Sequence, residues 1–140
     1  MIIEPDTDKN KGNKVGAVMV VGGGIGGMQA SLDLANAGFK VFLVEDTSAI
    51  GGVMAQLDKT FPTNDCSMCT ISPKLIEVGK HLNINIITTA QVEDVQGEEG
   101  NFKVKVKKRP RYIDIEKCNA CGDCIERCPV EVKSEFDEGL

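Results

Sequence analysis

Apolar and polar positions change their spacing along the chain, and this spacing predicts an α/β fold. Residues 15–21, VGAVMVV, form a continuous apolar run, which is typical of a strand buried in a parallel sheet. Residues 26–37 then carry apolar positions at helical spacing and end before Gly38, and residues 40–45, KVFLVE, form a second buried run. Together they predict a strand–helix–strand unit of about 30 residues, the size of a nucleotide-binding motif.

The next part of the chain predicts a long connection, a helix and a group of strands. Residues 46–72 have no regular spacing, and we expect Pro73 to begin a helix that ends near Lys80. Three strand-like runs follow, and together they resemble a β-meander. These runs cover residues 84–90, 91–97 and 101–109.

Composition and charge narrow the class of protein. The 140-residue chain has a net charge of −5, which argues against bulk affinity for nucleic acid. It has no apolar run of the roughly 20 residues needed to span a bilayer, and its polar N-terminus lacks the apolar core of a signal peptide. We therefore expect a cytoplasmic protein, in which clustered cysteines are metal ligands or redox groups rather than structural disulfides.

A glycine loop lies between the first predicted strand and the helix. Gly22, Gly24 and Gly27 have the G-x-G-x-x-G spacing, in which the glycines allow a tight turn, a close approach to a pyrophosphate and close helix–strand packing. Glu45 ends the second strand and can accept hydrogen bonds from ribose hydroxyls. The alternative is a glycine-rich turn of no special function, but the placement of the loop between strand and helix favours a dinucleotide site.

The glycine loop alone does not distinguish NAD from FAD. Gly51 and Gly52 form a second glycine pair shortly after Glu45. Flavoproteins of the two-dinucleotide-binding type resemble this arrangement, with a glycine pair beside the flavin pyrophosphate. The predicted meander resembles the one that follows the first half of their FAD domain, so we favour FAD as the cofactor.

Four cysteines close to the C-terminus have the spacing of iron–sulfur ligands. Cys118, Cys121, Cys124 and Cys128, with Pro129, form the C-x2-C-x2-C-x3-C-P run of bacterial ferredoxins. Zinc sites usually combine two C-x2-C pairs a dozen or more residues apart, so we predict a 4Fe–4S cluster. In two-cluster ferredoxins the fourth cysteine binds the other cluster, which leaves open whether Cys128 closes this one.

A further cysteine pair, Cys66 and Cys69, lies in the long connection. Such a C-x2-C pair can be a redox-active dithiol, half of a metal site or two thiols of no special function. The helix expected at Pro73 would place Cys69 just ahead of a helix N-terminus, which favours a thiolate. We expect either a catalytic dithiol or cluster ligands, and the residues alone do not decide between these roles.

These motifs resemble the family formed by the A subunits of heterodisulfide reductases, and quinone-interacting flavoproteins of sulfate reducers are near relatives. The resemblance covers the chain from about Val15 onwards and rests on VVGGGIGGMQASLDLANAGFKVFLVE, IGGVMAQLDKTFPTNDCSMC, SPKL and the ferredoxin run introduced by RYIDIEKC. It implies FAD bound by the glycines and Glu45, a 4Fe–4S cluster on the C-terminal cysteines, and an electron-transfer oxidoreductase subunit. Partners would be the other heterodisulfide reductase-like subunits, with a hydrogenase or ferredoxin.

The family's chains are several times longer, so the sequence resembles an N-terminal portion or a shortened paralogue, and we expect it not to be active alone. We expect four segments: a flexible leader, an incomplete Rossmann-type FAD/NAD(P)-binding domain, a ferredoxin-type module and an acidic tail. Electrons would pass between FAD and 4Fe–4S clusters towards reduction of the heterodisulfide of coenzymes M and B. The alternatives are a non-catalytic iron–sulfur assembly module and a flavin-dependent dithiol oxidoreductase that uses Cys66 and Cys69. The segments are residues 1–14, 15–110, 111–132 and 133–140.

Overall fold

The computed structural model describes residues 2–3 and 16–132, and the chain divides into two compact units. The first unit is Met1–Pro110 and the second is Arg111–Leu140. The expected acidic tail lies outside the described residues, as does most of the expected leader. Within the described ranges, no helix has both the length and the apolar composition that a membrane crossing requires.

A parallel sheet forms the centre of the first unit, as the buried apolar runs predict. Its strands are β2 (Ala17–Val21), β3 (Lys40–Val44) and β4 (Ile84–Ile87), with β3 in the middle. Helix α1 (Ile25–Asn36) connects β2 to β3, so the expected strand–helix–strand unit is present. The carboxyl ends of the strands therefore meet at one edge of the sheet, which is where ligands bind in open α/β folds.

The helix that was expected to begin at Pro73 begins six residues earlier. Helix α2 is Ser67–Lys80, and Pro73 lies inside it. Ser67, Ile71 and Val78 are fully buried on one face of α2, and packing of this face outweighs the preference of proline for a first helical turn. A short 3₁₀ helix, η1 (Gly52–Gln56), lies in the connection ahead of α2.

A second, antiparallel sheet contains β5 (Ala90–Glu98) and β6 (Asn101–Lys108) as a hairpin, with β1 (Ile2–Ile3) beside β6. The expected meander is therefore divided, because its first run became β4 and pairs in parallel with β3. Strand β4 is short and apolar, and a place beside β3 buries Ile87. Strand β1 lies within the segment expected to be a flexible leader.

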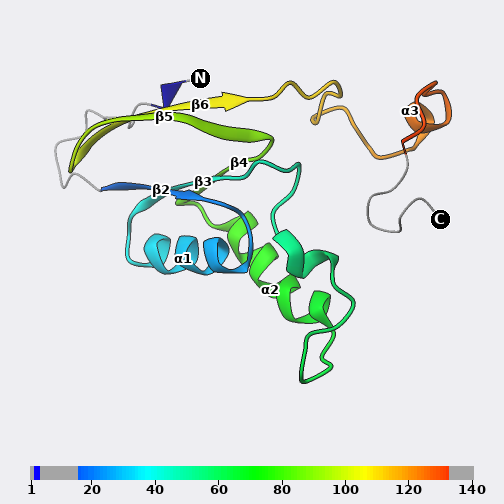
Figure 1. Ribbon diagram of the computed structural model, residues 1–140, viewed down its shortest axis with the longest axis horizontal. Coiled ribbons are helices and arrows are strands. Elements are labelled where there is room, and N and C mark those ends of the chain that lie inside the picture. Colours follow the sequence, from blue (N-terminus) through cyan, green and yellow to red (C-terminus); the bar gives the residue numbers. More distant parts are fainter. Residues whose placement is uncertain (1, 4–15, 133–140) are drawn as a thin grey trace. The chain divides into compact units, whose positions relative to one another are not determined.

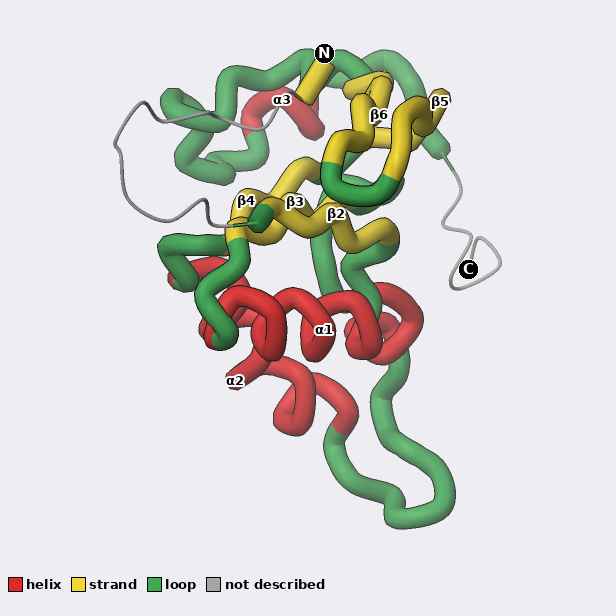
Figure 2. Tube along the Cα trace, turned by 90° about the vertical axis from the view of Figure 1, so that its left-hand side faces the viewer, coloured by secondary structure: helices red, strands yellow, loops and turns green. Residues whose placement is uncertain are grey.

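The first unit has three layers, with the helices on one face of the parallel sheet and the antiparallel sheet on the other (Figure 1). Figure 2 shows the same order from the side, with α1 and α2 together below the strands. The helix-side core comprises Met28, Leu32, Leu43, Ile71 and Val78. The core between the sheets comprises Phe42, Val44, Ile87, Ala90 and Val106. Side chains of β3 alternate between these two cores, which fixes its register.

Among residues 111–132, the second unit contains one short helix, α3 (Asp123–Glu126), and otherwise loops and turns. Every residue from 111 to 132 is exposed except Gly122, which is half-buried. Its apolar side chains include Ile113, Ile115 and Ile125, and each of them is more than half exposed. The described part of this unit therefore has no hydrophobic core of its own.

Candidate functional site

The glycine loop has the geometry that its spacing predicts. Gly22 has a φ of +104°, which favours glycine, and its N–H donates to the carbonyl of Val44 at 2.8 Å. Gly24 is the N-cap of α1. A Cβ at Gly27 would lie 1.9 Å from the carbonyl oxygen of Gly22, so only glycine permits α1 to pack this close to the turn. The loop and the start of α1 are thereby held as one rigid element.

The second glycine pair packs directly on the first loop. The N–H of Gly51 donates to the carbonyl of Gly23 at 2.7 Å, and a Cβ at Gly52 would lie 2.9 Å from the Cα of Gly24. Both Gly51 and Gly52 have positive φ angles, of +126° and +58°. The structure thus brings together two glycine segments that are about 30 residues apart in sequence and leaves no room for side chains between them.

Glu45 connects the end of β3 to the glycine loop. Its Oε2 accepts the N–H of Gly23 at 2.5 Å, and its Oε1 accepts the N–H and the hydroxyl of Thr47 at 2.8 and 2.7 Å. Partial burial acts to raise the pKa of Glu45, but the hydrogen bonds from Thr47 and Gly23 outweigh it and hold that pKa below its ordinary value. Glu45 is therefore a carboxylate at neutral pH, and it shapes the loop as well as facing the nearby pocket.

A pocket of about 350 Å³ lies at the carboxyl ends of β2 and β3. Its volume is within the range of about 300–1,000 Å³ that small-molecule sites occupy. Gly22 and Glu45 line it together with the start of β5, so both sheets of the first unit contribute. The lining residues are Val21, Gly22, Val44, Glu45, Asp46, Ala90, Gln91 and Val92.

The two glycine segments, Gly22–Gly27 and Gly51–Gly52, fit an extended dinucleotide such as FAD. Apart from chain neighbours, no atom lies within 4 Å of the position that a Cβ would take at Gly22 or Gly24, so the outer side of the loop is open to a ligand. The first turn of α1 has backbone N–H groups without acceptors inside the helix, and these suit a pyrophosphate. A dinucleotide bound at this helix start would have its ribose next to the acidic residue, Glu45, which lines the pocket.

The C-terminal cysteines lie on a loop whose turns suit a cluster. Cys118, Cys121, Cys124 and Cys128 are all exposed free thiols. Ala120 and Gly122 adopt left-handed backbone conformations, with φ angles of +60° and +91°, and they turn the chain between successive cysteines. Left-handed residues that alternate with ordinary ones direct N–H groups to one side, an arrangement found at iron–sulfur sites.

Within residues 2–3 and 16–132, no group of three or more His, Cys, Asp or Glu side chains converges on a single metal ion. A cubane cluster does not require such convergence, because each thiolate binds a different iron. The four thiols and the turned backbone therefore fit a 4Fe–4S cluster by their donor type and their loop.

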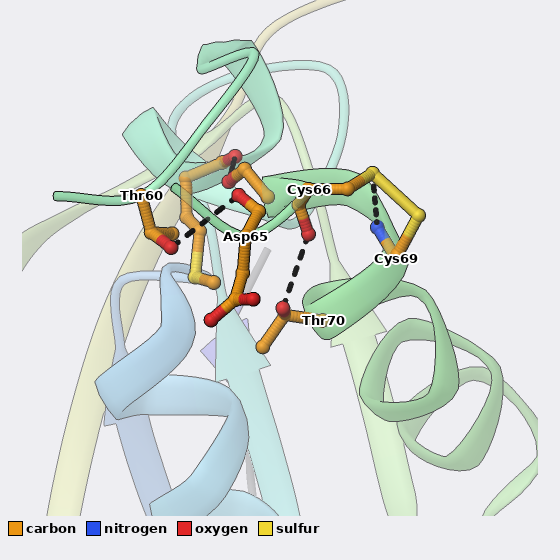
Figure 3. Close-up of a disulfide and its surroundings, with 7 residues drawn as sticks. Thr60, Asp65, Cys66, Cys69 and Thr70 are labelled. Atoms are coloured by element: carbon orange, nitrogen blue, oxygen red, sulfur yellow. Dashed lines mark hydrogen bonds between the residues drawn. A yellow bond between two sulfur atoms is a disulfide. The ribbon is translucent and has the colours of Figure 1, made fainter. Parts of the chain in front are cut away.

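The other cysteine pair, Cys66 and Cys69, forms a disulfide with a Cα–Cα distance of 5.3 Å (Figure 3). Cys66 is the N-cap of α2, and Cys69 lies in the first turn rather than ahead of the helix. The earlier start of α2 thus moves both cysteines to the helix start, where only Cys69 was expected.

The structure also adds residues that the motifs did not indicate. Thr47 holds the Glu45 carboxylate, and Gln91 lines the pocket from β5. Thr47 could have been suspected from its place two residues after the acidic strand end, since threonine commonly closes such turns. Gln91 has no local signal, because its position depends on how the two sheets pack.

The fold and this site define a class of protein, a flavin-dependent oxidoreductase domain followed by an iron–sulfur module. The family described as FAD dependent oxidoreductase matches residues 17–108, and the family described as 4Fe-4S binding domain matches residues 111–134. The chain belongs to the FAD dependent oxidoreductase family and carries a 4Fe–4S binding domain, which confirms FAD and a 4Fe–4S cluster as its cofactors. A solved structure, L-proline dehydrogenase from P. horikoshii, matches 69% of this chain and 20% of its own at 26% identity, with a TM-score of 0.53.

More particular relatives confirm the resemblance to the A subunits of heterodisulfide reductases. The chain is 58% identical to the A subunit of the H(2):CoB-CoM heterodisulfide,ferredoxin reductase of Methanothermobacter marburgensis, over 87% of this chain and 18% of that protein. It is 59% identical to the second iron-sulfur A subunit of the CoB–CoM heterodisulfide reductase of Methanopyrus kandleri, over 87% of this chain and 19% of that protein. The chain thus spans about a fifth of the length of these relatives.

Proposed function

We propose that this chain is the flavin- and iron–sulfur-bearing electron-transfer part of a heterodisulfide reductase-like enzyme. The observation that carries the proposal is the joining of the two glycine segments, through Gly51 and Gly23, at the start of α1. Identity above 50% to several subunits of this kind supports it. The chain alone would bind cofactors without completing the reaction.

The chain's own residues would bind and orient the cofactors. Gly22, Gly24 and Gly27 would seat the FAD pyrophosphate at the start of α1, with Gly51 and Gly52 covering it from the second segment. Glu45 would accept a ribose hydroxyl, because its Oε2 already accepts one bond, from Gly23, and keeps a free lone pair. FAD supplies the capacity to exchange electron pairs for single electrons, and the protein supplies orientation and electrostatics.

The four C-terminal cysteines would hold the 4Fe–4S cluster that exchanges electrons with FAD. Cys118, Cys121 and Cys124 would bind three of its irons, and Cys128 would bind the fourth. In the structure the thiol of Cys128 donates to the carbonyl of Val130 at 3.5 Å, so this thiol would have to turn to reach a cluster.

The names of the relatives support a proposal for the substrate and the partners. Their names include the CoB–CoM heterodisulfide, ferredoxin and H(2). We extend this to a role for the chain in reduction of that heterodisulfide, beside other subunits of the enzyme and with a hydrogenase or ferredoxin as electron source or acceptor. A cytoplasmic location belongs to the same proposal.

Cofactor content of anaerobically purified protein tests the proposal. We expect flavin absorbance together with iron and sulfide in equal amounts, about four of each per chain. Gly24→Val should remove flavin and keep iron, whereas Cys121→Ser should remove iron and keep flavin. Iron without flavin would favour a cluster assembly module, and protein that binds only zinc would contradict an electron-transfer function.

A further inference from the structure

The Cys66–Cys69 disulfide is a redox-capable group that the proposed route between FAD and the cluster does not use. Both residues are exposed, and the two cysteines belong to one C-x2-C unit. In reducing compartments, disulfides are as a rule transient and catalytic rather than structural. A bond that closes so short a loop also constrains the unfolded chain little.

The two sulfur atoms at the start of α2 differ in their hydrogen bonding. The Sγ of Cys66 accepts the backbone N–H of Cys69 at 3.2 Å, in the manner of an N-cap side chain. Helix α2 has 14 residues, so its N-terminus carries the partial positive charge of a full helix dipole. The dipole favours a thiolate on either cysteine, because both lie at the helix start. The N–H donor acts on Cys66 alone, and it favours a thiolate on Cys66 over one on Cys69 when the disulfide is reduced.

The chain around the pair is held in place by hydrogen bonds. The hydroxyl of Thr70 donates to the carbonyl of Cys66 at 3.1 Å, and the buried hydroxyl of Ser67 donates to the carbonyl of Met54 at 2.6 Å. The carboxylate of Asp65 points away from the two sulfur atoms (Figure 3). The helix start therefore keeps its geometry while the sulfur atoms stay accessible.

We infer that Cys66 and Cys69 form a thiol–disulfide exchange site, with Cys66 as the attacking thiolate and a disulfide as substrate. The Cys66 thiolate attacks one sulfur of the substrate, so the substrate S–S bond breaks and one of its sulfurs leaves and takes up a proton. The Cys69 thiol then loses its proton and attacks Cys66 Sγ, which forms the Cys66–Cys69 bond and releases the second substrate thiol. Two electrons and two protons pass to the substrate, and a dithiol reverses the reaction.

Thiol–disulfide exchange at Cys66 and Cys69 requires neither FAD nor the cluster. A negative result would therefore overturn this inference and leave the proposed function unaffected. The full chain is reduced with dithiothreitol under argon, freed of reductant and treated with iodoacetamide at pH 7. Peptide mass spectrometry then follows each cysteine separately. We expect Cys66 to react about tenfold faster than Cys69, because a larger fraction of it is thiolate.

Two serine variants distinguish the roles of the cysteines. Cys69→Ser keeps the stabilising donor, which is a backbone N–H, so Cys66 should remain fast and should accumulate a mixed disulfide with oxidised glutathione. Cys66→Ser should leave a slow Cys69. Serine is a good N-cap, so this variant keeps the start of α2 and is expected to fold. Met68→Leu, between the cysteines, is the matched control and should change neither rate.

The source of the substrate disulfide is decided by two probes, with dithiothreitol as the reductant. Faster turnover of insulin would identify a protein disulfide, and faster turnover of oxidised glutathione would identify a small one. Equal alkylation rates of the two cysteines, or turnover that survives in Cys66→Ser, would overturn the inference. Loss of iron or zinc from both serine variants would also overturn it, because the pair would then be a ligand pair.

Discussion

Gly27 illustrates how a single atom decides the geometry of the nucleotide loop. The carbonyl oxygen of Gly22 occupies the place where any other residue at position 27 would put its Cβ. A Cβ at Gly26, the preceding residue, would have no atom within 4 Å outside its chain neighbours and its own helix backbone. Two adjacent glycines therefore differ in whether the fold requires them, and only Gly27 belongs to the G-x-G-x-x-G motif.

This contrast gives the first prediction. Gly27→Ala should lower the free energy of unfolding by about 3 kcal/mol or more, because α1 must move away from the turn. Gly26→Ala should be neutral or stabilising by up to about 1 kcal/mol, since alanine is the better helix former. Thermal unfolding followed by circular dichroism measures both, and equal destabilisation of the two variants would contradict the close contact.

Glu45 should contribute a pH-dependent part of the stability. Its pKa in the folded chain lies below the ordinary value of 4.5, so its contribution is complete above about pH 4.5 and is lost as the pH falls through the folded-state pKa. The difference in unfolding midpoint between the wild type and Glu45→Gln should therefore shrink in acid. Thr47→Val removes one donor but keeps the carboxylate, so it should show a weaker acid dependence than the wild type.

At the residue scale, the glycine spacing predicted the turn at Gly22, which has a positive φ, and the close approach of α1 at Gly27. Spacing could not find Gln91, because the place of Gln91 at the pocket depends on how the two sheets pack. Whether the glycines and Glu45 bind FAD, and whether the C-terminal cysteines hold the cluster, remain predictions.

At the element scale, α2 shows why the sequence misplaced a helix start. Proline favours a first turn, and the local signal at Pro73 was strong. The helix nevertheless begins at Ser67, because Ser67 and Ile71 are both fully buried against the rest of the unit. Tertiary packing of this kind is absent from any local window of sequence.

The buried serine gives a prediction at this scale. Ser67→Ala should cost about 1–3 kcal/mol, since the carbonyl of Met54, in a partly buried hydrogen bond, loses its donor. Ser31 is equally buried, but its hydroxyl donates to Gly27, a carbonyl inside α1 that also serves as a helix acceptor. Ser31→Ala should therefore cost less than Ser67→Ala in urea denaturation, and the reverse order would argue against Ser67 as the anchor of α2.

At the scale of the whole molecule, the two units differ in what can stabilise them. The first has two hydrophobic cores, whereas the described residues of the second bury no apolar side chain. A small unit without a core commonly takes its folding energy from bound metal. Sequence alone predicted the order of the two units, but not that β4 and β5 would belong to different sheets.

Removal of the cluster should therefore affect the two units unequally. Oxidation followed by a chelator should abolish amide exchange protection in residues 111–132, because ligation supplies the stability of this unit. Protection within β3 and α1 should stay unchanged. Hydrogen exchange with mass spectrometry measures both, and retained protection around the C-terminal cysteines would show that the second unit folds without metal.

Because β3 is the central strand, both edges of the parallel sheet are formed by other strands, β2 and β4. Its neighbours β2 and β4 each present one side to β3, and neither has another partner in that sheet among residues 2–3 and 16–132. Backbone groups along the outer sides of these two strands can therefore accept additional strands without any change in the register already set. Strands added beside β2 or β4 would widen the parallel sheet. The glycine loop between β2 and α1 would keep its position.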